Sequence, residues 1–274
     1  MSGDLISKKL ISVREMAATL KDGDHVAFGG GGLLRKPMFA AVEVARSTVS
    51  SLHVSSFFAG PEVDLLIGVD KITTLSYAYV GFDVLGMAPN FRRVRETGKI
   101  QAKEYSEWMF LLALQAAASK VPFMPTRSGL GADLLHLPDS PFREFHCPIS
   151  GQPLVAVPAL VPDVAFIHAN EVDLEGNLQI WGDAFADVLL TRAATTVYAL
   201  ADRVVPSLTN VEKYPTFQIS RVWISAVAVV PDSTGFTGAP PSRAIDFEGV
   251  ADYQRNATSS KWLAHFVDGF GSAL

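Results

Sequence analysis

A run of four glycines constrains the fold of this chain more than any other feature of its sequence: Gly29, Gly30, Gly31 and Gly32. Residues 25–28, directly before the run, form a short apolar segment typical of a buried strand. Residues 38–45, after it, carry apolar side chains at helical spacing, and Pro37 suits the first turn of a helix there. The sequence therefore predicts a strand, a glycine loop and a helix, in that order.

Strand-like and helix-like segments alternate along the rest of the chain. Ser12 and Glu15 form a capping-box pattern, which predicts that a helix begins before the first strand. Further strands are predicted at 52–57, 72–80, 154–157, 164–169, 196–200 and 222–230, and a long helix at about 105–119. Alternation of this kind predicts an α/β fold, in which helices flank a mostly parallel sheet.

Domain organisation follows from the lack of dividing segments. No internal repeat and no linker rich in Pro, Gly or Ser interrupts the sequence, so we expect one domain over residues 1–274. Residues 137–153 contain four prolines, which favours an extended excursion over a regular element and equally fits a boundary between two lobes.

Charge and cysteine content exclude several classes of function. With 23 basic and 28 acidic residues the net charge is −5, so no basic excess exists to bind nucleic acid or an anionic membrane. The single cysteine, Cys147, cannot form an internal disulfide, and the six histidines show no metal-binding spacing. No apolar run approaches the ~20 residues that span a bilayer, so we expect a cytoplasmic protein without a metal site. Only 19% of the residues are charged, which we interpret as a surface partly buried against another protein chain.

The glycine run is a candidate binding loop. Without side chains, its backbone N–H groups can approach a phosphate or an oxyanion closely. It does not match a dinucleotide fingerprint, because Leu34 or Arg35 stands where the last glycine should be, and no Gly-Lys-Ser/Thr follows to make a Walker loop. A tight structural turn explains the run equally well.

Glu104 is the candidate catalytic carboxylate. It lies where a short strand leads into the long helix, near the positive end of the helix dipole, and such junctions often carry functional side chains. A carboxylate there can serve as nucleophile or base. The alternative is a capping or first-turn acid, with Glu107 in the same role.

Arg127 and Ser128 lie in a segment of rigid prolines and flexible glycines over residues 122–133. Such a segment can hold an arginine against a carboxylate or a phosphate of a ligand. An ion pair between Arg127 and a neighbouring acid is an equally good interpretation.

Taken in this order, these segments resemble the A chain of the class I CoA-transferases, of the glutaconate CoA-transferase type. The resemblance spans most of the chain and rests on Asp22-Gly-Asp24, Arg35-Lys-Pro-Met38, the block from Glu104-Tyr-Ser to Asp133, and Asp173-x-x-Gly-Asn177 with Gly182. Arg35-Lys-Pro-Met38 and Ser128-Gly-Leu-Gly131 are most similar to the A chain of hydrolases that open the last steroid rings as CoA thioesters.

The resemblance implies a CoA-transferase (NagB/RpiA-like) fold, a partner similar to the B chain of these enzymes, and an acyl-CoA substrate that brings coenzyme A without a tightly bound cofactor. It implies that the glycine amides hold an oxyanion and that the following residues contact the substrate: Arg35, Lys36, Arg127 and Ser128. In the ring-opening hydrolases the catalytic glutamate belongs to the A chain and matches Glu104. In glutaconate-type transferases it belongs to the B chain, and the present chain would then only bind or shape the substrate site.

One element departs from the family pattern. Many members carry Gly-Ala-His-Pro after a late strand, whereas this chain reads Gly238-Ala-Pro240-Pro241, with a proline in place of the histidine. The acyl group, and the choice between transfer and hydrolysis, stay open at the level of sequence.

Overall fold

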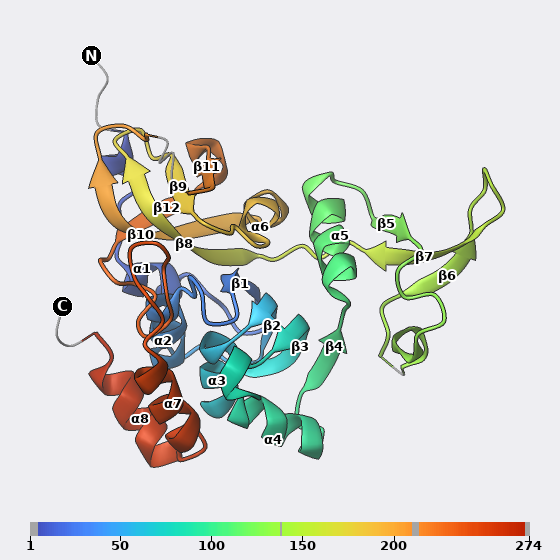
Figure 1. The fold of residues 1–274 in the computed structure, drawn as a ribbon, viewed down its shortest axis with the longest axis horizontal. Coiled ribbons are helices and arrows are strands. Elements are labelled where there is room, and N and C mark those ends of the chain that lie inside the picture. The colour runs from blue at the N-terminus through green and yellow to red at the C-terminus, as the bar shows by residue number, and fades with distance from the viewer. Residues whose placement is uncertain (1–4, 138, 210–213, 272–274) are drawn as a thin grey trace.

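A nine-stranded, mostly parallel sheet forms the centre of the structure, a computed structural model that describes residues 5–137, 139–209 and 214–271 (Figure 1). Its strands are β1 (His25–Gly31), β2 (Leu52–Ala59), β3 (Ile72–Val80), β4 (Gln101–Glu104), β8 (Val164–Asp173), β9 (Leu178–Trp181), β10 (Thr196–Val205), β11 (Thr216–Ile219) and β12 (Ala226–Val229). β1 pairs in parallel with β2 and β8, and the parallel pairing continues through β3 to β4 and through β10 to β12. Only β9 and β11 run antiparallel to their neighbours.

Helices cover both faces of this sheet. They are α1 (Val13–Ala18), α2 (Met38–Arg46), α3 (Pro61–Gly68), α4 (Pro89–Thr97), α5 (Glu107–Ala118), α6 (Asp187–Ala193), α7 (Phe247–Asn256) and α8 (Ser260–Gly269). Alternate strand residues enter two separate buried clusters: Phe28 and Phe166 pack on the side of α1 to α3, and Ala27 and Ile167 on the side of α5 and α6. A parallel sheet buried on both faces explains why its central strands β1 and β8 are buried almost throughout. No helix in the described ranges is both long and apolar enough to cross a bilayer.

Local chemistry explains where the helices begin. Ser12 accepts a hydrogen bond from Glu15 N–H and Glu15 accepts one from Ser12 N–H, so the predicted capping box is confirmed and α1 begins at Val13. Ser106 caps α5 by accepting from Met109 N–H at 3.2 Å, so the helix predicted at about 105–119 begins at Glu107. The strand predicted at 222–230 shortens to β12, because Ser220 accepts from Val222 N–H and starts a 3₁₀ turn.

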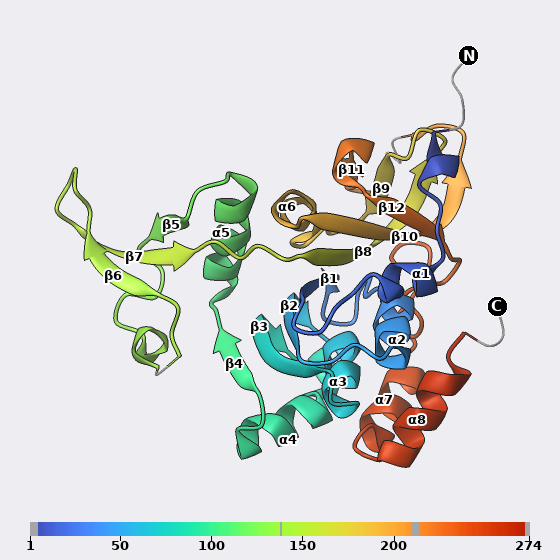
Figure 2. The ribbon, with the colours of Figure 1, turned by 180° about the vertical axis from the view of Figure 1, so that it is seen from behind.

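A second, three-stranded antiparallel sheet projects beyond α5, away from the main sheet (Figures 1 and 2). It consists of β5 (Phe123–Thr126), β7 (Pro153–Pro158) and β6 (Arg143–His146), in that spatial order. The predicted strand at 154–157 therefore exists but belongs to this sheet and not to the parallel one.

The excursion at 137–153 is more regular than its prolines suggest. It contains β6, which pairs with β7, so the expectation of a segment without a regular element is wrong there. The prolines do not break the strand because Pro141 and Pro148 lie outside it, and Pro153 begins its partner; Pro138 lies outside the described residues.

Candidate active site

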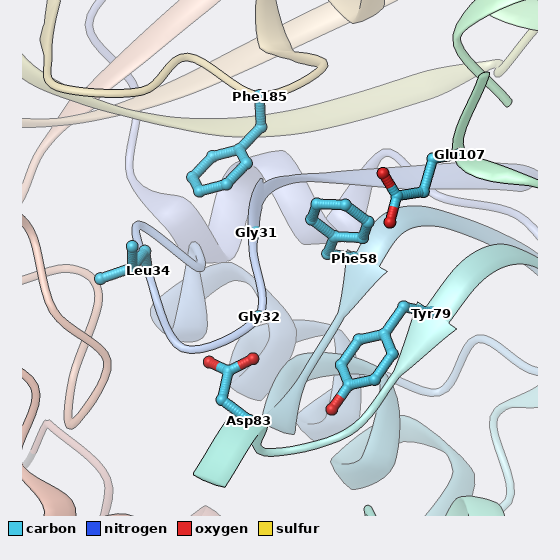
Figure 3. Close-up of a pocket in the computed structure, with 8 residues that line it drawn as sticks. All are labelled: Gly31, Gly32, Leu34, Phe58, Tyr79, Asp83, Glu107 and Phe185. Atoms are coloured by element: carbon cyan, nitrogen blue, oxygen red, sulfur yellow. The ribbon is translucent and has the colours of Figure 1, made fainter.

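A cavity of about 430 Å³ opens where β1, β2 and β3 end (Figure 3). Its lining residues are Gly31, Gly32, Leu34, Phe58, Tyr79, Asp83, Glu107 and Phe185. The carboxyl ends of parallel strands are the usual ligand-binding edge of such a sheet. Phe58 and Phe185 form apolar walls, with ring centroids 6.2 Å apart and ring planes at 79°. The volume lies within the range typical of small-molecule sites.

Glu107 supplies a carboxylate to this cavity from the first residue of α5 (Figure 3). Ser106 fixes the position of this residue by capping the helix. Asp83, in the 3₁₀ turn Asp83–Leu85 after β3, supplies the second carboxylate. Sequence reasoning assigned Glu107 only a capping role and did not single out Asp83 or Tyr79.

Glu104 is not among the described residues that line the cavity. It ends β4 opposite Tyr77 of β3, is exposed, and its Oε2 accepts a hydrogen bond from the Tyr77 hydroxyl at 3.3 Å. Burial, together with the adjacent Glu104 carboxylate, raises the pKa of Tyr77 to about 12. The Tyr77 ring packs against Phe91 of α4, 5.2 Å between centroids. Of the two glutamates that flank Ser106, the cavity-lining one among the described residues is Glu107.

The glycine run ends a strand and does not form a separate loop. β1 continues through Gly31, where the sequence predicted a strand ending at residue 28, and its register against β2 shifts between Phe28 and Gly31. Gly30 and Gly32 have φ of 71° and 57°, in the region that favours glycine. A Cβ at Gly29 would lie 2.5 Å from the Asp187 carboxylate, so that position also requires glycine.

The amides of Gly30, Gly31 and Gly32 already have acceptors inside the protein. Gly30 N–H donates to the Asp187 carboxylate at 2.8 Å. Gly31 N–H donates to the Leu34 carbonyl at 2.9 Å and Gly32 N–H to the Phe58 carbonyl at 2.8 Å. These contacts fix the cavity wall, and they leave those three N–H groups engaged away from a ligand.

Arg35 and Lys36 are buried in ion pairs. Arg35 is 1% exposed, and its Nη1 lies 2.8 Å from Asp187 Oδ2. Lys36 is fully buried, with Nζ 2.9 Å from Glu62 Oε1. Buried charges of this kind need partners, and here the two ion pairs fix the turn over residues 30–35, which we call the glycine turn. The predicted substrate contact by these two cations finds no support in this geometry, because neither side chain reaches the cavity surface.

The comparison with known proteins agrees with this architecture. Residues 10–224 match the family described as Coenzyme A transferase. The chain belongs to the coenzyme A transferase family. The resemblance seen in the sequence is thereby confirmed.

Individual relatives in the coenzyme A transferase family place the chain among the A chains of two-component enzymes. It is 31% identical to the IpdA chain of the cholesterol ring-cleaving hydrolase of Rhodococcus jostii, over 96% of this chain and 92% of that protein. It is 29% identical to the A chain of glutaconate CoA-transferase of Acidaminococcus fermentans, over 90% of this chain and 80% of that one. The crystal structure of the Acidaminococcus glutaconate CoA-transferase superposes with a TM-score of 0.86 at 24% identity, covering 97% and 89% of the two chains, which confirms the predicted fold.

The element in which this chain departs from the pattern of its family packs against the glycine turn. Arg35 N–H donates to the Gly238 carbonyl at 2.6 Å, and Gly238 N–H donates to the Leu33 carbonyl at 2.8 Å. The segment that contains Pro240 therefore supports the turn from the side opposite the cavity-lining Asp83, whose Oδ2 accepts from Leu33 N–H at 3.3 Å.

Arg127 and Ser128 lie behind the helix that carries Glu107. The Ser128 hydroxyl is 3.2 Å from the Ser106 hydroxyl, so it braces the residue that caps α5. Arg127 is exposed, and its side chain forms no ion pair with any residue in the described ranges. Neither residue belongs to the described lining of the cavity.

Proposed function

We propose that this chain is the A component of a heteromeric acyl-CoA hydrolase that cleaves a carbon–carbon bond of its substrate, with Glu107 as the catalytic carboxylate. The observation that carries the proposal is the Glu107 carboxylate on the wall of the cavity at the strand ends. The cavity is open on this chain, which suits completion by a partner similar to the B chain of these enzymes. Coenzyme A enters as part of the substrate, and the chemistry requires no tightly bound cofactor.

The position of the carboxylate favours hydrolysis over transfer. In the glutaconate-type transferases the glutamate that takes up CoA belongs to the B chain, as the resemblance implies. A carboxylate supplied by the present chain instead fits the ring-cleaving relatives, whose named activity is hydrolytic, although the resemblance matches their catalytic glutamate to Glu104 and not to Glu107. The apolar walls formed by Phe58 and Phe185 suit an alicyclic acyl group.

The proposed reaction consumes one water and needs no oxidant. Glu107 takes a proton from water as the oxygen adds to a ring ketone of the acyl group. The adduct collapses by breaking the bond between the former ketone carbon and the carbon next to the thioester. The electron pair moves to that second carbon, which the protonated Glu107 then protonates. The product is a ring-opened acyl-CoA that carries a new carboxylic acid, and this acid releases its proton to the solvent.

Tyr79 supplies a hydroxyl at the Asp83 end of the cavity, opposite the end that carries Glu107 (Figure 3). It lines the same cavity, and burial together with Asp83 raises the pKa of its hydroxyl, which keeps the O–H available as a donor.

Glu107→Gln and Glu104→Gln, each in the complex with the partner chain, separate the two candidate glutamates. We expect Glu107→Gln to lower kcat by about 10²- to 10⁴-fold, the usual contribution of a general base, with KM changed by less than about threefold. Glu104→Gln serves as the matched control and should keep kcat within about threefold. Loss of turnover in Glu104→Gln with Glu107→Gln intact would move the assignment to Glu104.

Hydroxylamine trapping separates hydrolysis from transfer. The wild-type complex is incubated with acyl-CoA and hydroxylamine, and both chains are analysed by mass spectrometry. We expect no modified glutamate on either chain. A glutamyl hydroxamate on the partner would show CoA transfer and leave the present chain with a binding role only.

A further inference from the structure

Exposed apolar residues flank the cavity beside both of its carboxylates. Val84 and Met87 follow Asp83 in the turn after β3, and they are 85% and 54% exposed. Trp108 follows Glu107 in the first turn of α5 and is 57% exposed. Asp83 and Glu107 lie at opposite ends of the cavity (Figure 3). We call Val84, Met87 and Trp108 the apolar rim.

The fold fixes both parts of the apolar rim. The Gln254 side chain of α7 donates to the Leu85 carbonyl at 2.6 Å and to the Met87 carbonyl at 3.4 Å, which ties the turn after β3 to the C-terminal helices. At the other end of the cavity, the Ser106 hydroxyl caps α5 two residues before Trp108. The rim is thus preorganised, which lowers the entropy cost of binding it to another surface.

Helix α5 extends the apolar surface beyond Trp108. Every residue of α5 except Glu107 and Gln115 is apolar, and a helix that is apolar on all faces is typical of a buried position. Trp108, Leu111 and Leu112 share one face by their helical spacing. On this chain that face is only partly covered, because Leu111 and Leu112 are half-buried and Trp108 is exposed.

A second protein chain fits the apolar rim better than a ligand in the cavity does. None of the three rim residues is among the described lining residues, so an acyl group held in the cavity leaves them uncovered. A chain that closes the cavity passes over both ends. The low share of charged residues, 19%, agrees with a surface that is buried in an assembly.

Tryptophan is enriched among the residues that carry most of the binding energy of protein interfaces, and it then fills a pocket of the partner. Resting on the proposed two-component assembly, we propose that the apolar rim is the docking surface for the partner chain, with Trp108 anchored in an apolar pocket of that chain.

The dissociation constant of the complex tests the anchor. The chain is produced together with the B-type chain of the same organism, and dissociation on dilution is followed by sedimentation velocity. We expect Trp108→Ala to weaken the complex at least about 30-fold, and Val84→Ser with Met87→Ser to weaken it about tenfold. Trp108→Phe keeps an aromatic ring and should recover most of the affinity. Trp223→Ala is the matched control: this tryptophan is 44% exposed outside the described cavity lining, and its loss should change the affinity less than about threefold.

Fluorine NMR gives a readout that does not depend on affinity. This chain contains four tryptophans, so labelling it alone with 5-fluorotryptophan gives four resonances, and Trp108→Phe and Trp223→Phe assign two of them. We expect the Trp108 resonance to lose its shift between H₂O and D₂O when the unlabelled partner binds. The Trp223 resonance should keep its shift.

The outcomes separate this proposal from the proposed function. An unchanged dissociation constant in Trp108→Ala, or a Trp108 resonance that stays exposed in the complex, overturns the docking surface and leaves the acyl-CoA function intact. Self-association of the separate chain that Trp108→Ala abolishes would instead assign the rim to a second copy. An intact Trp108→Ala complex that binds S-hexyl-CoA at least about tenfold more weakly would assign Trp108 to the substrate. Failure of the wild-type chain to bind the B-type chain overturns both the docking surface and the two-component assembly.

Discussion

The charged side chains on the two sides of the glycine turn differ in burial and in pairing. Behind the turn, Arg35 pairs with Asp187 and Lys36 with Glu62, and all four side chains are almost completely buried. On the cavity side Asp83 and Glu107 are exposed and face no cation of this chain among the described lining residues. A few backbone residues thus separate buried, paired charges, which stabilise the fold, from exposed carboxylates, which a ligand can reach.

This difference indicates which charged residues near such a turn can act on a ligand. A buried charge that is paired inside the protein is shielded from a ligand, whatever its place in a motif. A charge that is exposed in a concave site can interact with a ligand. Substitutions on the two sides should therefore affect different quantities: stability behind the turn, and binding or turnover in front of it.

Asp187→Ala is expected to give the largest loss of stability. It removes the carboxylate that pairs with the buried Arg35 guanidinium and accepts from Gly30 N–H, and breaking a buried pair in this way typically costs about 3–5 kcal/mol. The free energy of unfolding, from urea denaturation, measures it. Asp83→Asn is the control from the cavity side and should lose less than about 1 kcal/mol. Equal losses in both variants would remove the distinction between the two sides.

Asp64 sharpens the comparison, because it is buried without a cation. Its carboxylate accepts from Asn90 N–H, Phe91 N–H and the Tyr253 hydroxyl, which ties α3 to α4 and α7. Burial outweighs these hydrogen bonds and raises the pKa of Asp64 from its usual range to about 6.

The raised pKa of Asp64 determines whether the stability of the protein rises or falls with pH. The folded protein holds the Asp64 proton more tightly than the unfolded chain, so its contribution to stability is complete below pH ~4 and is lost as pH rises through about 6. We expect the wild type to lose about 1–3 kcal/mol more than Asp64→Asn between pH 4 and 6.5, in urea denaturation at a series of pH values. Parallel pH profiles of the two proteins would contradict the raised pKa.

The order of strands and helices could be predicted because it depends on local periodicity. β3 begins and ends at the predicted residues, and the capping box at Ser12 places α1 correctly. Membership of a sheet is not local: β7 has a strand's sequence, yet it pairs with β5 and β6 because the chain leaves the main sheet after α5. The sequence contains no signal for that departure except the prolines, which also fit an irregular segment.

The charged site residues were harder to predict because their surroundings come from distant parts of the chain. Arg35 and its partner Asp187 are 152 positions apart, so nothing near the motif shows that its charge is satisfied. Glu104 and Glu107 differ in direction because one ends β4 beside Tyr77 and the other begins α5 after the Ser106 cap. The rule that ligands bind at the carboxyl ends of strands would have pointed to Asp83, which follows β3.

Ser128→Ala is expected to give the smallest effect and tests how the two glutamates come to differ. Ser128 contacts the Ser106 hydroxyl at 3.2 Å and so acts on Glu107 only through the cap of α5. Removing one partly buried hydrogen bond should cost about 0.5–1.5 kcal/mol of stability. A purely structural role would lower stability alone. A positioning role also lowers kcat, by about three- to tenfold at unchanged KM, because a small displacement of a catalytic group slows the chemical step more than binding. Ser128→Thr keeps the hydroxyl and should recover most of kcat, whereas an unchanged kcat in Ser128→Ala would show that Ser106 holds Glu107 without help.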